Sequence, residues 1–461
     1  MQPIKKFLLF CLLALTGCTT TPTPSLTTNT PPPQPVTVTP QPTDPTLTPL
    51  PAITVTPAPT AILPTSALAF PVGPGGADVI PHQIVRTASD HLYIFSATQS
   101  SNLLRVYHTL QPGFPSSAAD FAPVIEFTAP AEIISVDAVY DGIETIYALI
   151  NTQSGAIFDV PFDTGSDQFR PVVLLAEDGG TIASGLYIGT SGVSGMVDLT
   201  GRLNVAYWRD DDHILFRAYD YDRAANTLTP QAAFLQVDDA GQANHPVLAV
   251  SPADNSLTIA WVSEADSPTL IRARTRASDG SWGAVEVAST FNFPPEVAVW
   301  TSPDNGLNID QGPSLLIDAS GVRHLVYIES FNGAIGDYGR VHYVTGTVSG
   351  WVDEALAFLS HDPALAINAA GELYILGHGH HRNAAADSAC FSMDVMCFSK
   401  HSAGSNWSVP APILAPTGSY SFDASPSVKW SAVGFNRPEV IEFIFFSTPY
   451  DAPTVYYARL P

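Results

Sequence analysis

The chain has 461 residues, with 43 Asp and Glu against 19 Lys and Arg, which gives a formal net charge of −24. A field of this sign repels phosphate groups and anionic lipid headgroups. Nucleic acids are therefore excluded as partners, and any contact with a membrane needs another cause than surface charge.

The first 18 residues have the organisation of a targeting segment. Lys5 and Lys6 precede an apolar run over residues 7–15, which is too short to span a bilayer as a helix. The run ends in Leu15-Thr16-Gly17-Cys18, which resembles the signal of bacterial lipoproteins. This resemblance implies that residues 1–17 are removed and that Cys18 carries lipid. We expect an extracytoplasmic protein, anchored through Cys18 to the bacterial cell membrane or cell surface.

Residues 18–66 follow as a linker. Between positions 19 and 64 lie 15 Thr, 14 Pro and one charged residue, Asp44. Proline fixes φ and removes hydrogen-bond donors, and the segment has too little apolar surface to form a core. We expect a disordered, extended tether whose hydroxyl groups are open to glycosylation.

Residues 67–461 show short β-branched and aromatic runs between Gly, Asp, Asn and Ser turns. Four runs open with a proline, and three of these units carry a tryptophan in their last strand: Pro246, Pro313, Pro363 and Pro426, then Trp282, Trp351 and Trp407. Weaker units start near positions 80, 133 and 186. The pattern predicts an all-β, seven-bladed β-propeller with four-stranded blades. The alternative is a pair of β-sandwich domains.

The last unit, which ends in "TVYYARLP", lacks an outer strand, and residues 67–79 are the segment expected to supply it. Such an exchange would close the ring and cover the exposed sheet edges. We expect a monomer.

This region resembles the sialidase-like, BNR-type repeat propellers of bacterial surface proteins. The turn with Asp279, Gly280 and Trp282 is similar to a shortened aspartate box, and "VIPHQIV" at 79–85 is similar to the opening of sialidases with Val79 at the arginine position. The resemblance implies the fold. It does not imply sialidase activity, because no comparable set of arginines for a substrate carboxylate is present.

The long loops all belong to one face of the expected ring, and loops of unusual length are often functional. They cover residues 291–312, 329–340 and 378–397, with a shorter loop at 209–213. Cys390 and Cys397 lie in one of them, and an extracytoplasmic location favours a local disulfide. A zinc site with the nearby histidines is the alternative.

Side chains at the starts of inner strands or in these loops are the candidate ligand-binding residues. They are His82, Trp300, Asp310, Glu329, Phe331, Asp337, Asp362, His378, His380 and His381. If the protein is an enzyme, His245 or His361 is the expected base, Arg382 would neutralise a substrate carboxylate and Tyr338 would protonate the leaving oxygen. This combination resembles that of some polysaccharide lyases. A hydrolase using paired carboxylates is the other enzymatic option.

No cofactor is predicted with certainty. Asp210, Asp211 and Asp212, or Asp220 and Asp222, could hold Ca²⁺, although a solvated hairpin is the simpler interpretation. The histidines at 378–381 could bind another divalent metal, and the metal content stays open. The leading hypothesis is recognition of a glycan or a protein at the cell surface. A glycan-cleaving enzyme is the alternative, and an envelope scaffold is the third option.

Overall fold

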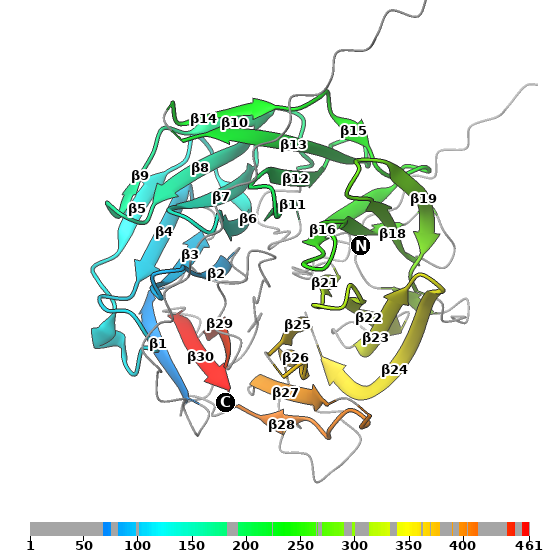
Figure 1. Ribbon diagram of the computed structural model, residues 1–461. Helices are drawn as coiled ribbons and strands as arrows, with labels where there is room; N and C mark the ends of the chain where they lie inside the picture. Colours follow the sequence, from blue (N-terminus) through cyan, green and yellow to red (C-terminus); the bar gives the residue numbers. More distant parts are fainter. Residues whose placement is uncertain are drawn as a thin grey trace, which may run out of the picture. The chain divides into compact units, whose positions relative to one another are not determined.

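The computed structural model describes residues 68–74, 82–97, 101–181, 192–223, 225–263, 265, 270–289, 297–299, 313–331, 339–360, 363–368, 370–378, 390, 396–402, 404–413, 440–447 and 454–460. Seven antiparallel sheets are arranged in a ring, with β2, β6, β11, β16, β21 and β25 nearest its centre (Figure 1). The predicted all-β, seven-bladed propeller is thus confirmed. The one helix among the described residues is the short 3-10 helix η1 (Ala118–Asp120), and no helix there is long and apolar enough to cross a membrane.

The first three blades follow the chain from its centre-facing strand outward. Blade 1 contains β2 (His82–Arg86), β3 (Leu92–Ala97), β4 (Leu103–His108) and β5 (Ile125–Thr128). Blade 2 contains β6 (Ile133–Tyr140), β7 (Thr145–Thr152), β8 (Ile157–Asp163), β9 (Gln168–Phe169) and β10 (Val173–Ala176). Blade 3 contains β11 (Val193–Val197), β12 (Leu203–Trp208), β13 (Ile214–Asp222), β14 (Thr227–Pro230) and β15 (Leu235–Gln236). In blades 2 and 3 the outer strand is interrupted, and both of its pieces pair with the third strand.

Blade 4 contains β16 (Ala243–Val250), β17 (Leu257–Ser263), β18 (Leu270–Arg276) and β19 (Trp282–Val287). Blade 5 contains β20 (Val297–Val299), β21 (Ser314–Ile317), β22 (Arg323–Phe331), β23 (Gly339–Thr347) and β24 (Gly350–Ser360). Blade 6 contains β25 (Ala364–Ile367), β26 (Leu373–His378), β27 (Met396–His401) and β28 (Ala411–Pro412). In blade 5 it is the inner strand that is interrupted, because both β20 and β21 pair with β22.

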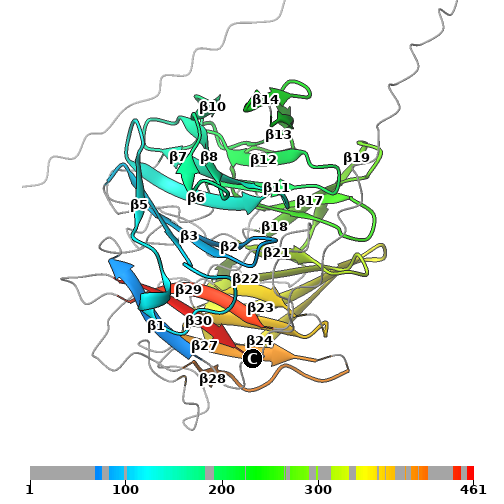
Figure 2. The same ribbon diagram turned by 60° about the vertical axis from the view of Figure 1, so that its left-hand side comes forward.

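Blade 7 joins the two ends of the described chain. β29 (Ile441–Ser447) and β30 (Thr454–Leu460) form a hairpin, and β1 (Leu68–Pro74) pairs antiparallel with β30 from Leu68↔Arg459 to Pro74↔Thr454. β1 and β30 lie side by side in both ribbon views (Figures 1 and 2). The predicted closure of the ring by the segment at 67–79 is confirmed. The fourth proline-led repeat, with Pro426, lies outside the described residues.

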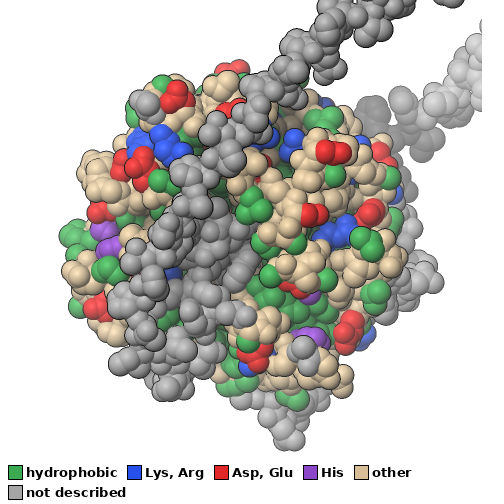
Figure 3. All heavy atoms as spheres, in the orientation of Figure 1, with side chains coloured by type: hydrophobic (Ala, Val, Ile, Leu, Met, Phe, Trp, Pro, Cys, Tyr) green, Lys and Arg blue, Asp and Glu red, His purple; other side chains and the backbone are tan. Residues whose placement is uncertain are grey.

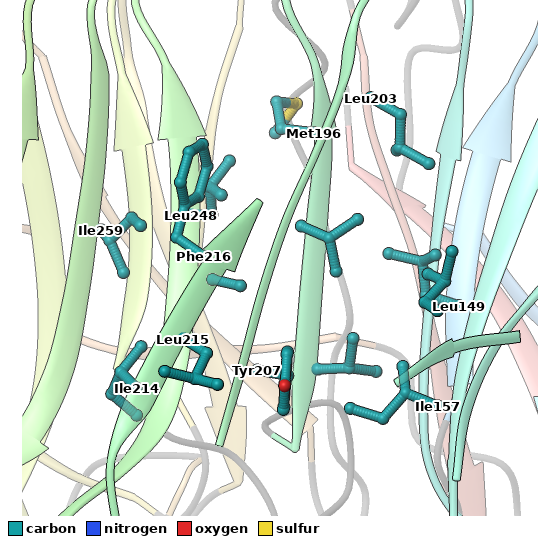
Figure 4. Packing of buried hydrophobic residues seen from close by; sticks show 14 of the residues in the cluster. Leu149, Ile157, Met196, Leu203, Tyr207, Ile214, Leu215, Phe216, Leu248 and Ile259 are labelled. Carbon is teal, nitrogen blue, oxygen red and sulfur yellow. The ribbon is translucent and has the colours of Figure 1, made fainter. Parts of the chain in front are cut away.

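Burial explains why inner and outer strands have different sequences. The inner strand β6 is buried along its whole length, so it is an almost continuous apolar run. The outer strands β5 and β19 are half-buried to exposed and carry mixed residues. The cores lie between the blades: in Figure 4, Leu149 and Ile157 of blade 2 come from the sheet next to that of Tyr207 and Leu203 in blade 3.

The repeated tryptophans attach each blade to the preceding one. The Trp282 ring of blade 4 meets Phe216 of blade 3 with 5.2 Å between ring centroids. Trp351 of blade 5 donates from Nε1 to Glu286 of blade 4 at 2.6 Å. Trp407 of blade 6 meets Tyr343 of blade 5 at 5.0 Å. The sequence repeat therefore reflects one position at the boundary with the preceding blade, where tryptophan makes a ring contact twice and a hydrogen bond once.

A second repeated contact joins neighbouring inner strands. The residue that makes this contact lies four positions before the first residue of the turn that follows the inner strand. Ser314, for example, lies four positions before Asp318. The bonds are Gln83 Nε2 to Asp137 Oδ1 at 2.9 Å, Gly195 N to Asp137 Oδ2 at 2.7 Å, Leu248 N to Ser194 Oγ at 3.2 Å, and Leu365 N to Ser314 Oγ at 3.1 Å. Val247 and Ala364 hold the same position in blades 4 and 6 and cannot form this bond. Polar side chains near the centre therefore hold the blades in register.

The turns opposite the long loops are closed by their first side chain. Asp318 Oδ1 accepts the N–H groups of Ser320 and Val322, and Asn368 Oδ1 accepts those of Ala370 and Glu372. This use of Asp and Asn is the expected Asx-turn chemistry. These side-chain hydrogen bonds explain why the turns at 318–322 and 368–372 are short.

A buried ion pair crosses the junction between blade 1 and blade 7. Arg86 of β2 donates from Nε to Glu442 Oε2 of β29 at 2.6 Å, and a second bond joins the same two side chains. Their side chains are 2% and 8% exposed, and Tyr457 also donates to Glu442 at 2.7 Å. Burial opposes the charge of Arg86, but the Glu442 carboxylate more than offsets this and raises the pKa of the guanidinium.

We predict that Glu442→Gln lowers the free energy of unfolding by up to about 3–5 kcal/mol, because it removes the bidentate counter-charge of a buried guanidinium and leaves Asp90, at 3.0 Å, as its carboxylate partner. Denaturant unfolding followed by fluorescence measures this loss. Glu126→Gln is the matched control, since Glu126 pairs with Arg105 in the same blade at 3.0 Å but is 44% exposed. It should cost less than about 1 kcal/mol. Equal effects of the two variants would contradict the closing role of Glu442.

Candidate functional site

The best described part of the long-loop face lies over blades 2, 3 and 4. It is formed by residues 177–181, 208–213 and 237–245, which we call the acidic loop cluster. Glu177, Asp210, Asp211, Asp212 and Asp239 are exposed, and Asp178 is half-buried. Arg209 and Arg272 are the basic residues that pair with this group, through Asp211 and Asp239. The local field is therefore negative, and it disfavours an anionic ligand.

Backbone hydrogen bonds hold the three segments of the cluster together. Gly180 N donates to Trp208 O at 2.8 Å, and Asp210 N donates to Asp178 O at 3.1 Å. Ala243 N donates to Asp212 O at 2.8 Å and so connects blade 3 to the start of blade 4. A Cβ on Gly180 would lie 2.4 Å from the Trp208 ring, so the close approach of the first two segments requires glycine.

Two side chains bind carboxylates of the cluster. Arg209 donates from Nη2 to Asp211 Oδ2 at 2.6 Å. Tyr207 donates to Asp178 Oδ1 at 2.8 Å, and burial raises the pKa of that hydroxyl. The carboxylates are thus presented by a rigid frame, which lowers the entropy lost when a ligand binds.

A histidine–aspartate pair lies at the centre of the cluster. His213 Nδ1 is 2.8 Å from Asp238 Oδ2, and Asp238 also accepts Ile214 N at 2.8 Å and Gly241 N at 3.0 Å. Asp238 is 2% exposed at its side chain, whereas His213 is 25% exposed. A carboxylate at Nδ1 favours the tautomer with the proton on that nitrogen, which leaves Nε2 as the accepting nitrogen.

His245, a predicted catalytic residue, lies on the same segment. It is 2% exposed, and its backbone has φ 51°, in the left-handed region that non-glycine residues rarely adopt. The register of β16 with β17 shifts between Asn244 and Val247, so His245 forms a β-bulge at the start of the inner strand. Bulges of this kind often redirect a side chain next to a functional site.

The structure corrects the predicted place of three candidates. Glu329 and Phe331 lie at the end of β22, where they pair with Val299 and Val297 of β20, and not in a loop. His378 is the last residue of β26 and pairs with Met396. β22 is longer than the sequence suggested because both of its neighbours, β20 and β23, extend toward the loop face. The loop-like composition of residues 329–340 gives no sign of this pairing.

The disulfide is confirmed, because Cys390 and Cys397 are bonded and both are buried. His82 begins β2. The other predicted site residues lie outside the described residues: Cys18, Trp300, Asp310, Asp337, Tyr338, His361, Asp362, His380, His381 and Arg382.

The hypothesis of a Ca²⁺ site finds no added support. Asp220 and Asp222 are in β13 and are bonded to Arg202 and Gln231, and to Ala225 N, respectively. No group of three or more His, Cys, Asp or Glu side chains in the described part of the chain is placed to hold a metal.

Sequence reasoning missed His213 and Asp238 as a pair. They are 25 residues apart, and only the return of β15 onto β13 brings them together. Another pair, His342 and Asp353, is linked at 2.7 Å, and Tyr327 also donates to Asp353 at 2.6 Å. Because these side chains of His342 and Asp353 are 0% and 1% exposed, this pair joins β22, β23 and β24 and is not a surface site.

No family model matches the sequence, and no curated protein matches it. Among solved structures, the chain is similar to an α-L-arabinanase of Penicillium chrysogenum complexed with arabinobiose (TM-score 0.43, 10% identity, 86% of this chain and 98% of that chain). It is also similar to an α-L-arabinofuranosidase of Fusarium graminearum with arabinobiose (TM-score 0.42, 10% identity, 86% and 97%). A third match is AofleA from Arthrobotrys oligospora (TM-score 0.41, 9% identity, 76% and 91%).

The charged surface of the molecule is mixed on the face seen in Figure 3, where Asp and Glu side chains lie beside Lys and Arg.

We predict that Asp238→Ala destabilises the cluster by about 2–4 kcal/mol, because it leaves two backbone N–H groups and His213 without their acceptor. Hydrogen exchange should show faster exchange at Ile214 and Gly241. Asp239→Ala, which removes the exposed neighbouring carboxylate, is the control and should leave those two amides unchanged. The same acceleration in both variants would show that Asp238 does not organise the loops.

Proposed function

We propose that this propeller is a recognition module that binds an uncharged, hydroxyl-rich glycan through the acidic loop cluster. The observation that carries the proposal is the rigid array of carboxylates at 177–178, 210–212 and 239, in which arginine neutralises Asp211 and Asp239 alone. Sugar hydroxyl groups donate to carboxylates in short, charge-assisted hydrogen bonds. An anionic polysaccharide would meet repulsion at the same surface.

The proposal also gives the N-terminal region a role as an anchor and a tether. Lipid on Cys18 and the Thr/Pro tether at 18–66 would hold the propeller at the outer side of a bacterial membrane, within reach of surface glycans. The resemblance to sialidase-like propellers concerns the fold alone, and we do not propose sialidase activity.

A glycan-cleaving activity is the second candidate. It is favoured by the His213–Asp238 pair, in which a buried carboxylate orients a partly exposed imidazole. Such a histidine is suited to proton transfer near neutral pH. The strained backbone of His245 in the same cluster points in the same direction.

We predict that the protein retains uncharged polysaccharides and releases acidic ones in a binding panel. The double variant Asp211→Asn with Asp212→Asn should weaken retention about tenfold or more, since each charge-assisted hydrogen bond contributes about 1.5–3 kcal/mol. Asp220→Asn is the control, because Asp220 is an exposed carboxylate in β13 outside the cluster.

Two outcomes of this panel would overturn the recognition reading. If the protein retained only acidic polysaccharides, this would contradict the proposal that the carboxylates of the cluster bind the glycan. New reducing or unsaturated ends, lost in His213→Ala while retention persists, would establish the enzyme instead.

A further inference from the structure

Asp159 is a carboxyl group in an unusual environment. It lies in the middle of β8, opposite Leu149 of β7 and Val173 of β10, and it is 0% exposed. Neither of its carboxylate oxygens has a hydrogen-bond partner among the described residues. Buried carboxylates are normally paired, so this position requires an explanation.

Two phenols, one from each blade at the interface, lie close enough to Asp159 to feel its charge. Burial raises the pKa of the Tyr147 hydroxyl, and the carboxyl groups of Asp141 and Asp159 raise it further. Burial also raises the pKa of Tyr219 of β13, and Asp159 contributes to that shift. Both hydroxyl groups are buried without a hydrogen-bond partner in the described structure. Asp159 thus shares the boundary between blades 2 and 3 with two buried phenols.

Two arginines lie at this interface, and neither forms an ion pair with Asp159; Arg217 acts on Tyr219, where it opposes the rise in pKa. Arg217 of β13 lies over the Phe234 ring at 3.5 Å, and its guanidinium is 5.9 Å from the Tyr219 ring. Arg223 pairs with Asp141 at 3.0 Å.

The remaining groups on this side are Arg170 and Tyr221. Arg170 pairs with Asp163 at 2.5 Å and with Glu144 at 3.2 Å, and it also donates to the Tyr221 hydroxyl. No cation in the described part of the chain forms an ion pair with Asp159. An ionised carboxylate here would therefore be isolated, at a cost of several kcal/mol.

We propose that Asp159 is an uncharged carboxylic acid in the folded protein, and that loss of its proton loosens the packing of blade 2 on blade 3. As an acid, the group can donate one hydrogen bond and accept another, as a phenol can, so the three polar groups are chemically matched. As a carboxylate, it can only accept, and it places a charge in the apolar interface. Consistent with this, burial raises the pKa of Asp159 well above its usual range.

The position of Asp159 connects this proton to the acidic loop cluster. Ile157, two residues earlier on β8, pairs with Asn151, which donates from Nδ2 to Gly180 O at 2.9 Å. A Cβ on Gly179 would lie 2.9 Å from Ile157 Cγ1, so this side chain packs directly under the loop. The same segment is bonded to blade 3, because Gly180 N donates to Trp208 O at 2.8 Å, so separation of the two blades at Asp159 would disturb residues 177–181. The propeller thus contains a pH-dependent element beneath its candidate binding surface.

The direction of the pH effect follows from proton linkage. Below about pH 4, Asp159 is protonated in the folded and the unfolded chain alike. Above that pH, unfolding releases its proton, so stability is lost as the pH rises toward the raised pKa of the folded state. The unfolding equilibrium constant of the wild type, relative to a variant that cannot ionise, should increase by up to about tenfold per pH unit.

The test is the unfolding of the purified protein from about pH 4 to pH 8, in wild type, Asp159→Asn and Asp220→Asn. Asp159→Asn should have no advantage at the acid end and a growing advantage as the pH rises. The exposed control Asp220→Asn should follow the wild type. Equal pH dependence of wild type and Asp159→Asn would overturn the proposal.

Two readouts on the wild type do not depend on the folding of a variant. Infrared spectroscopy should show a protonated carboxylic acid band near neutral pH, which Asp159→Asn lacks. Hydrogen exchange at residues 173–181 and 203–219 should accelerate with pH beyond the intrinsic rate. Absence of the band, or exchange in these segments that follows the intrinsic rate alone, would show that Asp159 is already ionised or that its charge does not affect the interface.

Discussion

The closure of the ring between β1 and β30 is the constraint on which the rest of the structure depends. It pairs Leu68 with Arg459, residues from opposite ends of the propeller, and the Arg86–Glu442 pair seals the same junction from inside. Each blade is a small sheet that cannot bury its faces alone, and it is stable because neighbours cover both sides. An open ring would expose the edge of β30 and a face on blades 1 and 7. Closure is therefore a condition for every interface, although bringing such distant segments together is entropically costly.

Within the closed ring, polar groups determine which contacts between blades are fixed and which, by our proposal, change with pH. The links through Asp137 and Ser194 hold inner strands at a fixed register, so the loops above them begin at fixed points. The acidic loop cluster uses this rigidity, with Asp238 holding both His213 and the chain beside it. Asp159 is the opposite case, a buried polar group without a partner at the interface beneath these loops. The candidate binding surface and the proposed pH-dependent interface thus share blades 2 and 3.

The sequence predicted those parts of the fold that recur locally. The spacing of proline and tryptophan identified the blades because Trp282, Trp351 and Trp407 each contact the blade before their own. The missing outer strand pointed to closure by the N-terminal segment, and the expected extracytoplasmic location pointed to the Cys390–Cys397 disulfide. Features that arise between segments could not be predicted in this way. The pairing of His213 with Asp238 depends on the return of β15, Glu329 lies in a strand because β20 extends to it, and Asp159 is isolated because another blade covers it.

The most direct test of the closed ring is a cross-link between β1 and β30. Ala69 and Ala458 are partners in the register, so Ala69→Cys with Ala458→Cys would place two thiols across the closing pair of strands. Denaturant unfolding is then compared between the oxidised and the reduced protein. If closure controls the whole propeller, oxidation raises the stability of a single cooperative transition by about 4 kcal/mol or more. If both forms unfold at the same midpoint, or if only the signal of blade 7 shifts, the blades are stable without closure and the central role of β1 is contradicted.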